Sequence, residues 1–153
     1  MNSRRRNFIM LAGNAGALTV AGLLIPDRGW AASWNTPAFE SKAVTDALKG
    51  IGAVNLIESK DISITAPDIA ENGAVVPVGV TSTIPKTESI AILIEKNPNM
   101  LAAVFTIPAG TEPSLPTRVK MGQSSNIYAL VKADGKYYVA SKEVKVTLGG
   151  CGG

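Results

Sequence analysis

Residues 89–107 read SIAILIEKNPNMLAAVFTI, and this stretch decides the fold class. Two apolar runs, 89–95 and 100–107, are rich in Ile, Leu and Val, and β-branched residues of this kind favour strands. Between them, residues 96–99 (KNPN) carry the Asn and Pro that are typical of a turn. The stretch therefore predicts a β-hairpin built from two apolar strands.

Short apolar runs continue on both sides of this hairpin. They cover residues 62–66, 76–81, 119–121, 127–131, 137–139 and 144–148. Residues 133–136 (ADGK) add the Asp-Gly signature of a tight hairpin turn. Many short strands separated by turn signals are typical of a sandwich. We therefore expect a mainly β fold, an antiparallel immunoglobulin-like β-sandwich of about seven strands. Residues 90–94 fit a core strand and an apolar edge strand equally well.

One helix is expected before the strands. Thr36 is a favourable N-cap, and Pro37 suits the first helical position. Apolar residues then recur at spacings of three and four, at Phe39, Ala43, Val44, Ala47, Leu48 and Ile51. Gly50 or Gly52 is expected to end the helix. The apolar face predicts simple packing against the sheet.

The N-terminal segment is typical of a targeting signal rather than of folded structure. Arg5, Arg6 and Phe8 match the twin-arginine export signal, although Arg4 stands where that pattern usually has Ser or Thr. A short apolar stretch interrupted by glycines follows these residues. This arrangement predicts export by the twin-arginine pathway and a periplasmic location.

The predicted cleavage site follows Ala31, because Gly29 and Ala31 are the small residues that such a site requires. Residues 1–31 are then a signal peptide, and residues 32–148 form one domain that holds the helix and the β-sandwich. A membrane anchor that is never cut is the less favoured alternative, since a spanning helix needs about 20 predominantly apolar residues.

The positive charge of the chain lies in this predicted signal. Residues 1–31 contain four arginines and one aspartate, which accounts for the whole formal net charge of +3. The remaining chain is neutral overall. It therefore gives no support for binding nucleic acid or an anionic membrane, which would need a basic patch.

The chain has one cysteine and no histidine. An intramolecular disulfide is therefore impossible, and nucleophile pairs that need histidine are excluded together with histidine metal sites. The sequence also shows no paired catalytic motif and no phosphate loop. We expect no enzymatic activity of its own, no metal and no cofactor.

The last five residues are GGCGG. Four glycines surround Cys151, namely Gly149, Gly150, Gly152 and Gly153. Glycine-rich segments behave as flexible coils, so residues 149–153 are predicted to form a flexible arm that presents the thiol. Because no histidine is present to form the thiolate, activation is expected from a partner. An intermolecular disulfide through Cys151 is the alternative.

This arm, together with residues 66–78 (APDIAENGAVVPV), resembles the SoxY family, the sulfur-carrier subunits of the thiosulfate-oxidising Sox system. The resemblance implies that Cys151 is the covalent attachment site and that the four glycines form a swinging arm. It implies loading of thiosulfate as a cysteine S-thiosulfonate, followed by release of sulfate and a remaining persulfide.

The resemblance also implies partners. A SoxZ-like subunit would form a heterodimer with the chain. A c-type haem enzyme of the SoxAX kind, a SoxB-like hydrolase and a SoxCD-like sulfur dehydrogenase would act on the arm. A ubiquitin-like sulfur carrier, which also ends in Gly-Gly, is a weaker alternative, because its chemistry is cytoplasmic and its strand order differs.

Residues 68–73 hold two carboxylates, Asp68 and Glu71, and end in the Asn72-Gly73 turn pair. A calcium loop needs more oxygen ligands at set spacing than this run supplies. A solvated turn between strands is therefore expected here, with a docking surface as the alternative.

Overall fold

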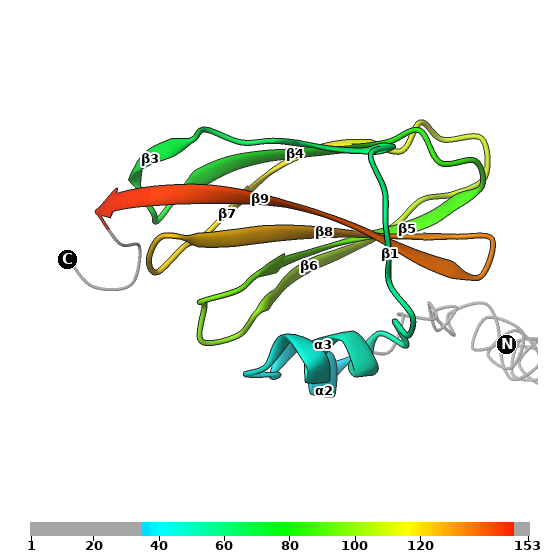
Figure 1. Ribbon diagram of the computed structural model, residues 1–153, viewed down its shortest axis with the longest axis horizontal. Helices are drawn as coiled ribbons and strands as arrows, with labels where there is room; N and C mark the ends of the chain where they lie inside the picture. The colour runs from blue at the N-terminus through cyan, green and yellow to red at the C-terminus, as the bar shows by residue number, and fades with distance from the viewer. Residues whose placement is uncertain (1–34, 149–153) are drawn as a thin grey trace, which may run out of the picture. The chain divides into compact units, whose positions relative to one another are not determined.

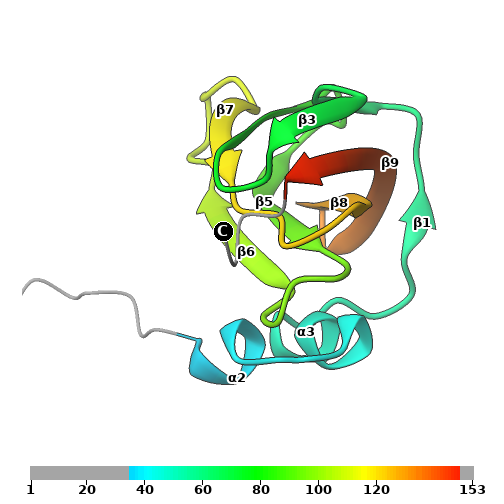
Figure 2. The same ribbon diagram turned by 90° about the vertical axis from the view of Figure 1, so that its left-hand side faces the viewer.

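In the computed structural model, which describes residues 35–148, the chain forms two β-sheets with two short helices packed on one of them (Figures 1 and 2). The helices are α2 (Thr36–Phe39) and α3 (Val44–Gly50). The strands are β1 (Ile57–Glu58), β2 (Ile62–Thr65), β3 (Ile69–Asn72), β4 (Val76–Ser82), β5 (Thr87–Ile94), β6 (Leu101–Thr106), β7 (Ser114–Val119), β8 (Ser125–Ala133) and β9 (Lys136–Leu148).

The larger sheet has the order β1-β9-β8-β5-β6, and β3 pairs with β9 as well. The smaller sheet has the order β2-β4-β7 and is antiparallel. Strands β5, β6, β8 and β9 also pair in antiparallel fashion, whereas β1 and β3 run parallel to β9. The mainly β fold class is therefore confirmed. The described part of the chain has nine strands rather than about seven, and its larger sheet is mixed rather than purely antiparallel.

The main core lies between the two sheets. Strand β5 contributes Ile90, Ile92 and Ile94, each fully buried, and β4 faces them with Val76 and Val80. On the other face of β5, Ala91 and Leu93 are covered by the helices. Because both faces of β5 are buried and both of its edges are paired, residues 90–94 form a core strand and not an open edge.

The expectation of one continuous helix is wrong, because the chain breaks after Phe39 and resumes at Val44. Asn35, rather than Thr36, is the N-cap, and its side chain accepts a hydrogen bond from the Ala38 N–H. At the break, the Ser41 hydroxyl donates to the Pro37 carbonyl over 2.6 Å, and such side-chain bonds compete with helix continuation.

The two helices approach each other closely where α3 ends. A Cβ atom on Gly50 would lie 2.7 Å from the Ala38 Cα, so only glycine fits at this contact. The Asn35 amide also donates to the Gly50 carbonyl over 2.6 Å. The prediction that Gly50 or Gly52 ends the helix is confirmed, since α3 ends at Gly50.

Three further expectations need correction. Residues 137–139 and 144–148 belong to one strand, β9. Strand β7 ends at Val119, whereas the sequence suggested a strand over 119–121. Residues 69–72 form strand β3 rather than a solvated turn, because they pair with β9. Among residues 35–148, no helix has the length and apolar character needed to span a membrane.

Candidate functional site

Strand β9 extends beyond its main partner. Its pairing with β8 runs from Lys136, opposite Ala133, to Val144, opposite Ser125. Strand β8 begins at Ser125, so residues 145–148 have no partner on that strand. We call residues 145–148 the arm root, because the sequence continues from Leu148 directly into GGCGG.

Strand β3 pairs with this extension. Ile69 lies opposite Lys145, Ala70 opposite Val146 and Asn72 opposite Leu148, all in parallel register (Figure 2). No other strand of the described chain pairs with β3. The arm root is therefore held on one side by a strand that pairs with this part of β9 alone.

Backbone hydrogen bonds fix both ends of this pairing. The Lys145 N–H donates to the Asp68 carbonyl over 2.9 Å, and the Gly73 N–H donates to the Leu148 carbonyl over 2.7 Å. The Thr147 hydroxyl donates to the Glu71 carbonyl over 3.0 Å. These groups are uncharged, so they hold the arm root without dependence on the charge of any side chain.

On the other side, the Ser124 hydroxyl replaces the missing β8 partner. It accepts a hydrogen bond from the Val146 N–H over 2.8 Å and lies 3.4 Å from the Val146 carbonyl, to which it donates. One small side chain therefore satisfies both backbone groups of Val146, as a neighbouring strand would.

A lysine ties β9 to the segment before β3. The Lys142 ammonium donates to the Ala66 carbonyl over 2.7 Å and lies 3.1 Å from the Asp68 carboxylate. Asp68 is 91% exposed, so this ion pair is screened by solvent and contributes little by itself.

Three apolar side chains are exposed around the arm root. Ile69 is 58%, Val75 55% and Leu148 59% exposed to solvent. Asn72 pairs with Leu148, and the Val75 N–H donates to the Asn72 carbonyl, which places Val75 beside the end of β9. The surface at the base of the arm is therefore partly apolar.

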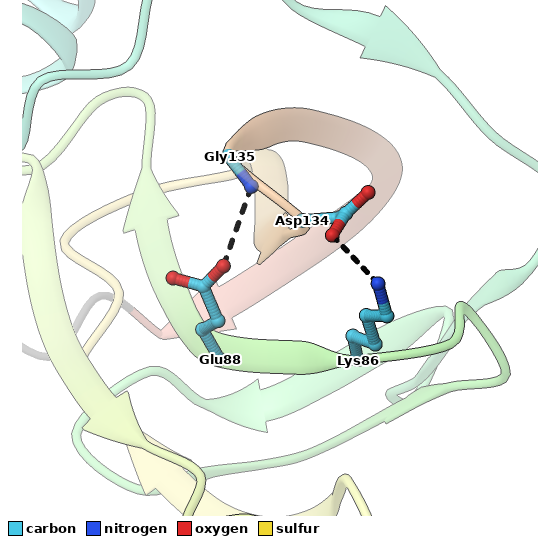
Figure 3. Close-up of polar contacts among 4 residues, drawn as sticks. All are labelled: Lys86, Glu88, Asp134 and Gly135. Atoms are coloured by element: carbon cyan, nitrogen blue, oxygen red, sulfur yellow. Dashed lines mark hydrogen bonds and ion pairs between the residues drawn. The ribbon is translucent and has the colours of Figure 1, made fainter.

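The opposite end of β9 carries a charged cluster (Figure 3). Lys86 bonds Asp134 over 3.0 Å, and Glu88 accepts from the Gly135 N–H over 3.3 Å. Lys132 lies 2.8 Å from the other oxygen of Glu88. The hydrogen bond from Lys132, helped by Gly135, lowers the pKa of the Glu88 carboxyl below its ordinary value.

The same contact raises the pKa of the Lys132 ammonium, chiefly through its hydrogen bond to Glu88. A depression of about 370 Å³ beside this pair is also lined by Val104 and Tyr137. Both charged groups are engaged with each other, so the arrangement suits stabilising the β8–β9 hairpin better than catalysis. Among residues 35–148, no group of three or more Asp or Glu side chains is placed to hold a metal.

The residues that the sequence singled out for function lie outside the described residues. These are Cys151 with Gly149, Gly150, Gly152 and Gly153, and the signal residues Arg5, Arg6 and Phe8. What sequence reasoning missed is the support at the arm root, namely β3 and Ser124. The signal was present in residues 66–78, but nothing local indicates that this stretch pairs with a strand about 76 positions later.

Comparison with known proteins decides the family. Residues 49–151 match the family model described as sulfur oxidation protein SoxY. The chain belongs to the SoxY family. The matched range includes Cys151 and covers β1 to β9. The recognition of a SoxY-type carrier protein of sulfur oxidation from residues 66–78 and 149–153 is therefore confirmed.

A solved SoxY structure agrees with the fold. The sulfur carrier protein SoxY from Chlorobium limicola f. thiosulfatophilum is 38% identical, with a TM-score of 0.61. The alignment covers 67% of this chain and 93% of that chain. A structure of the bacterial superantigen toxic shock syndrome toxin-1 aligns at 12% identity, over 56% of this chain and 98% of that chain, with a TM-score of 0.40, which is too low to carry an argument. A search of curated protein sequences finds no match.

Proposed function

We propose that the protein carries sulfur intermediates covalently on the thiol of Cys151 and presents them to partner enzymes during thiosulfate oxidation. The observation that carries this proposal is the SoxY family match, which extends to residue 151 and so includes the lone cysteine. The protein acts as a substrate carrier, and the catalytic groups belong to its partners.

The arm root supports this role geometrically. Cys151 lies three residues after Leu148, a distance of about 10 Å in a fully extended chain. An enzyme that acts on the thiol must therefore approach the arm root closely. The exposed apolar side chains of Ile69, Val75 and Leu148 suit such a contact, since buried apolar surface stabilises association.

The chemistry follows from thiosulfate and a thiol. In the loading step, the Cys151 sulfur forms an S–S bond to the terminal sulfur of thiosulfate, and the thiol proton and two electrons leave. A c-type haem enzyme of the SoxAX kind accepts the electrons. Water then cleaves the bond to the sulfone, which departs as sulfate with a proton and leaves a cysteine persulfide. A SoxB-like hydrolase performs this step, and a SoxCD-like dehydrogenase oxidises the remaining sulfur.

The proposal includes a SoxZ-like subunit as heterodimer partner and a periplasmic location reached by the twin-arginine pathway. An arm that serves large enzymes outside the cytoplasm must be exported with its carrier. The match of Arg5, Arg6 and Phe8 to the export signal supports this part.

The first test is the intact mass of protein purified from thiosulfate-grown cells, before and after reduction. We expect a reducible addition of thiosulfonate or sulfur on the C-terminal peptide. Cys151→Ser should lose every addition while the free energy of unfolding stays within about 0.5 kcal/mol of the wild-type value. A wild-type protein that carries only a disulfide to a second chain under active turnover would support the structural alternative.

The second test concerns export. Replacing Arg5 and Arg6 together by lysine should leave the protein in the cytoplasm with its signal segment attached, because the twin-arginine pathway reads both side chains. Fractionation and the N-terminal mass of the purified protein measure this. Normal export of the double variant would contradict the twin-arginine assignment and leave the carrier role untouched.

A further inference from the structure

Strand β3 has an unusual position in the larger sheet. It is four residues long, it pairs with no other strand in the described chain, and its pairing covers only the part of β9 that extends past β8. Ser124 holds Val146, in the middle of the same segment, through hydrogen bonds to its backbone N–H and carbonyl. Strand β3 and the Ser124 side chain therefore each support the arm root, where β8 provides no pairing partner.

We propose that β3 and Ser124 form a splint that fixes the point from which the Cys151 arm departs, with Ser124 as a positioning residue for sulfur transfer. The inference rests on the proposed function, in which Cys151 is the carrying group. It goes further because it assigns a role in transfer to residues that never contact the sulfur.

The length of the tether shows why a splint matters. With the arm root held, the arm starts at Leu148 and Cys151 reaches about 10 Å. If residues 145–148 detach, the arm starts at Val144, seven residues before Cys151, and the reach grows to about 24 Å. The effective concentration of a tethered group falls roughly as the −3/2 power of the tether length, so lengthening the tether from three to seven residues lowers the effective concentration of the thiol at a docked enzyme by roughly 3- to 4-fold.

Protection of an edge is the structural alternative for β3. A short strand that covers the end of β9 would also block pairing with another chain. That role needs only that β3 be present, whereas a splint needs the arm root to stay attached. The Ser124 hydroxyl separates the two roles, because it holds Val146 without covering the outer edge of β9.

Three variants test the splint. Ser124→Ala removes both hydrogen bonds to Val146, and Ser124→Thr retains a hydroxyl and should restore them. Ser114→Ala is the matched control, since its hydroxyl bonds Thr81 over 3.0 Å on the smaller sheet, which carries no arm. Hydrogen exchange at the amides of residues 145–148 should be roughly 5- to 10-fold faster in Ser124→Ala and unchanged in the other two.

A nitroxide on Cys151 reports where the thiol travels, and the native chain accepts the label at one position because it has one cysteine. In the wild type, paramagnetic broadening should centre on β3, residues 121–124 and the end of β9. In Ser124→Ala the broadened region should spread further over the domain. Unchanged exchange, or an unchanged region of broadening, would overturn the splint whatever the arm carries.

Enzymatic loading gives the functional readout. With the full chain, its co-purified partner subunit and the haem enzyme that loads thiosulfate, Ser124→Ala should lower the saturating rate several-fold and leave the half-saturating carrier concentration near the wild-type value, because docking is unchanged and only the delivery of the thiol after docking is weakened. Ser124→Thr should behave as wild type. If exchange rises in Ser124→Ala but loading matches Ser114→Ala, the splint has no role in transfer, while the carrier function stands. If the wild type itself is never loaded, the carrier function fails, and the exchange and nitroxide results still decide whether the splint holds the arm root.

Discussion

The two ends of β9 are held by different kinds of interaction. At its start, a two-residue turn joins β8 to β9, with positive φ angles of 49° at Asp134 and 73° at Gly135. The ion pair of Lys86 with Asp134 lies at this turn (Figure 3), and Lys132 pairs with Glu88 nearby. At its other end, the arm root is held by uncharged backbone bonds to β3 and by the Ser124 hydroxyl.

The two ends differ in whether neighbouring or distant residues in the sequence determine their structure. The turn end is specified by residues adjacent in sequence. Exposed ion pairs add to its stability, so the stability of this end should depend on pH and salt. The arm root is specified by pairing between residues far apart in the chain, such as Ala70 and Val146. Its uncharged bonds should keep the base of the arm in place under conditions that loosen the hairpin.

The largest expected effect is a loss of stability that destabilises both ends of β9 together. Val144 is fully buried and is the last residue of β9 that pairs with β8. Val144→Ala should lower the free energy of unfolding by about 2 kcal/mol, from lost apolar burial and the cavity left behind. Urea denaturation measures this loss. Val104→Ala is the control, since Val104 is 42% exposed, and an equal loss there would contradict this account.

A smaller effect concerns the turn end alone. Gly135→Ala places a side chain at a φ of +73°, where open space surrounds the new Cβ, so the cost is backbone strain of about 1 kcal/mol. Hydrogen exchange should rise at the β8–β9 turn and stay constant at the arm root.

Gly110→Ala provides the matched comparison for Gly135→Ala. Gly110 has a φ of +83° and equally open surroundings, but it lies in the loop before β7. It should cost a similar free energy without changing exchange at the β8–β9 turn. Faster exchange at the arm root in Gly135→Ala would show that the two ends are coupled, which contradicts the comparison.

The smallest effect is a pH dependence confined to the turn end. The pKa of Glu88 is lowered below its ordinary value of 4.5 by Lys132 and the Gly135 N–H. A depressed carboxyl stabilises the fold above its unfolded pKa, and this contribution is lost as pH falls through the folded pKa. The stability difference between wild type and Glu88→Gln should therefore be constant near neutral pH and shrink below pH 4.5.

The Lys132 ammonium gives the opposite sign, because its pKa is raised above 10.5. Its contribution should be present at neutral pH and disappear only as pH rises beyond 10.5. Added salt should weaken both contributions, since the pair is exposed. Hydrogen exchange at the amides of the arm root should not follow the titration of Glu88 or of Lys132. A parallel change there would contradict the view that uncharged hydrogen bonds hold the arm root.

Sequence reasoning succeeded where the chain's near neighbours decide the structure. The Asp134-Gly135 signature predicts a tight turn, and the structure has it between Ala133 and Lys136. The KNPN run at 96–99 likewise separates β5 from β6, which pair as the predicted hairpin. Whether residues 90–94 form a core strand or an edge strand is left open by the sequence, and the structure shows that Ile90, Ile92 and Ile94 are buried.

Sequence reasoning failed where contacts between residues far apart in the chain decide the structure. Residues 69–72 contain Glu71 and Asn72, which disfavour strands, yet they form β3 because β9 supplies a parallel partner. The helix break after Phe39 brings Gly50 close to Ala38, a contact between separate helices that the local pattern does not indicate. The attachment of sulfur to Cys151 came from the family resemblance and stays a proposal.

The parallel partners of β9 also bear on how the chain is made. Strand β9 is the last described strand to leave the ribosome. Strands β1, β3 and β8 all pair with β9, so these pairings cannot form before it emerges. At about 5–20 residues per second, the nascent chain spends seconds with one edge of β8 unpaired and its apolar face, including Ile127 and Val131, incompletely covered. Synthesis that stalls before Lys136 would release a chain prone to aggregate. The larger sheet can therefore complete its pairing only after its C-terminal strand has emerged.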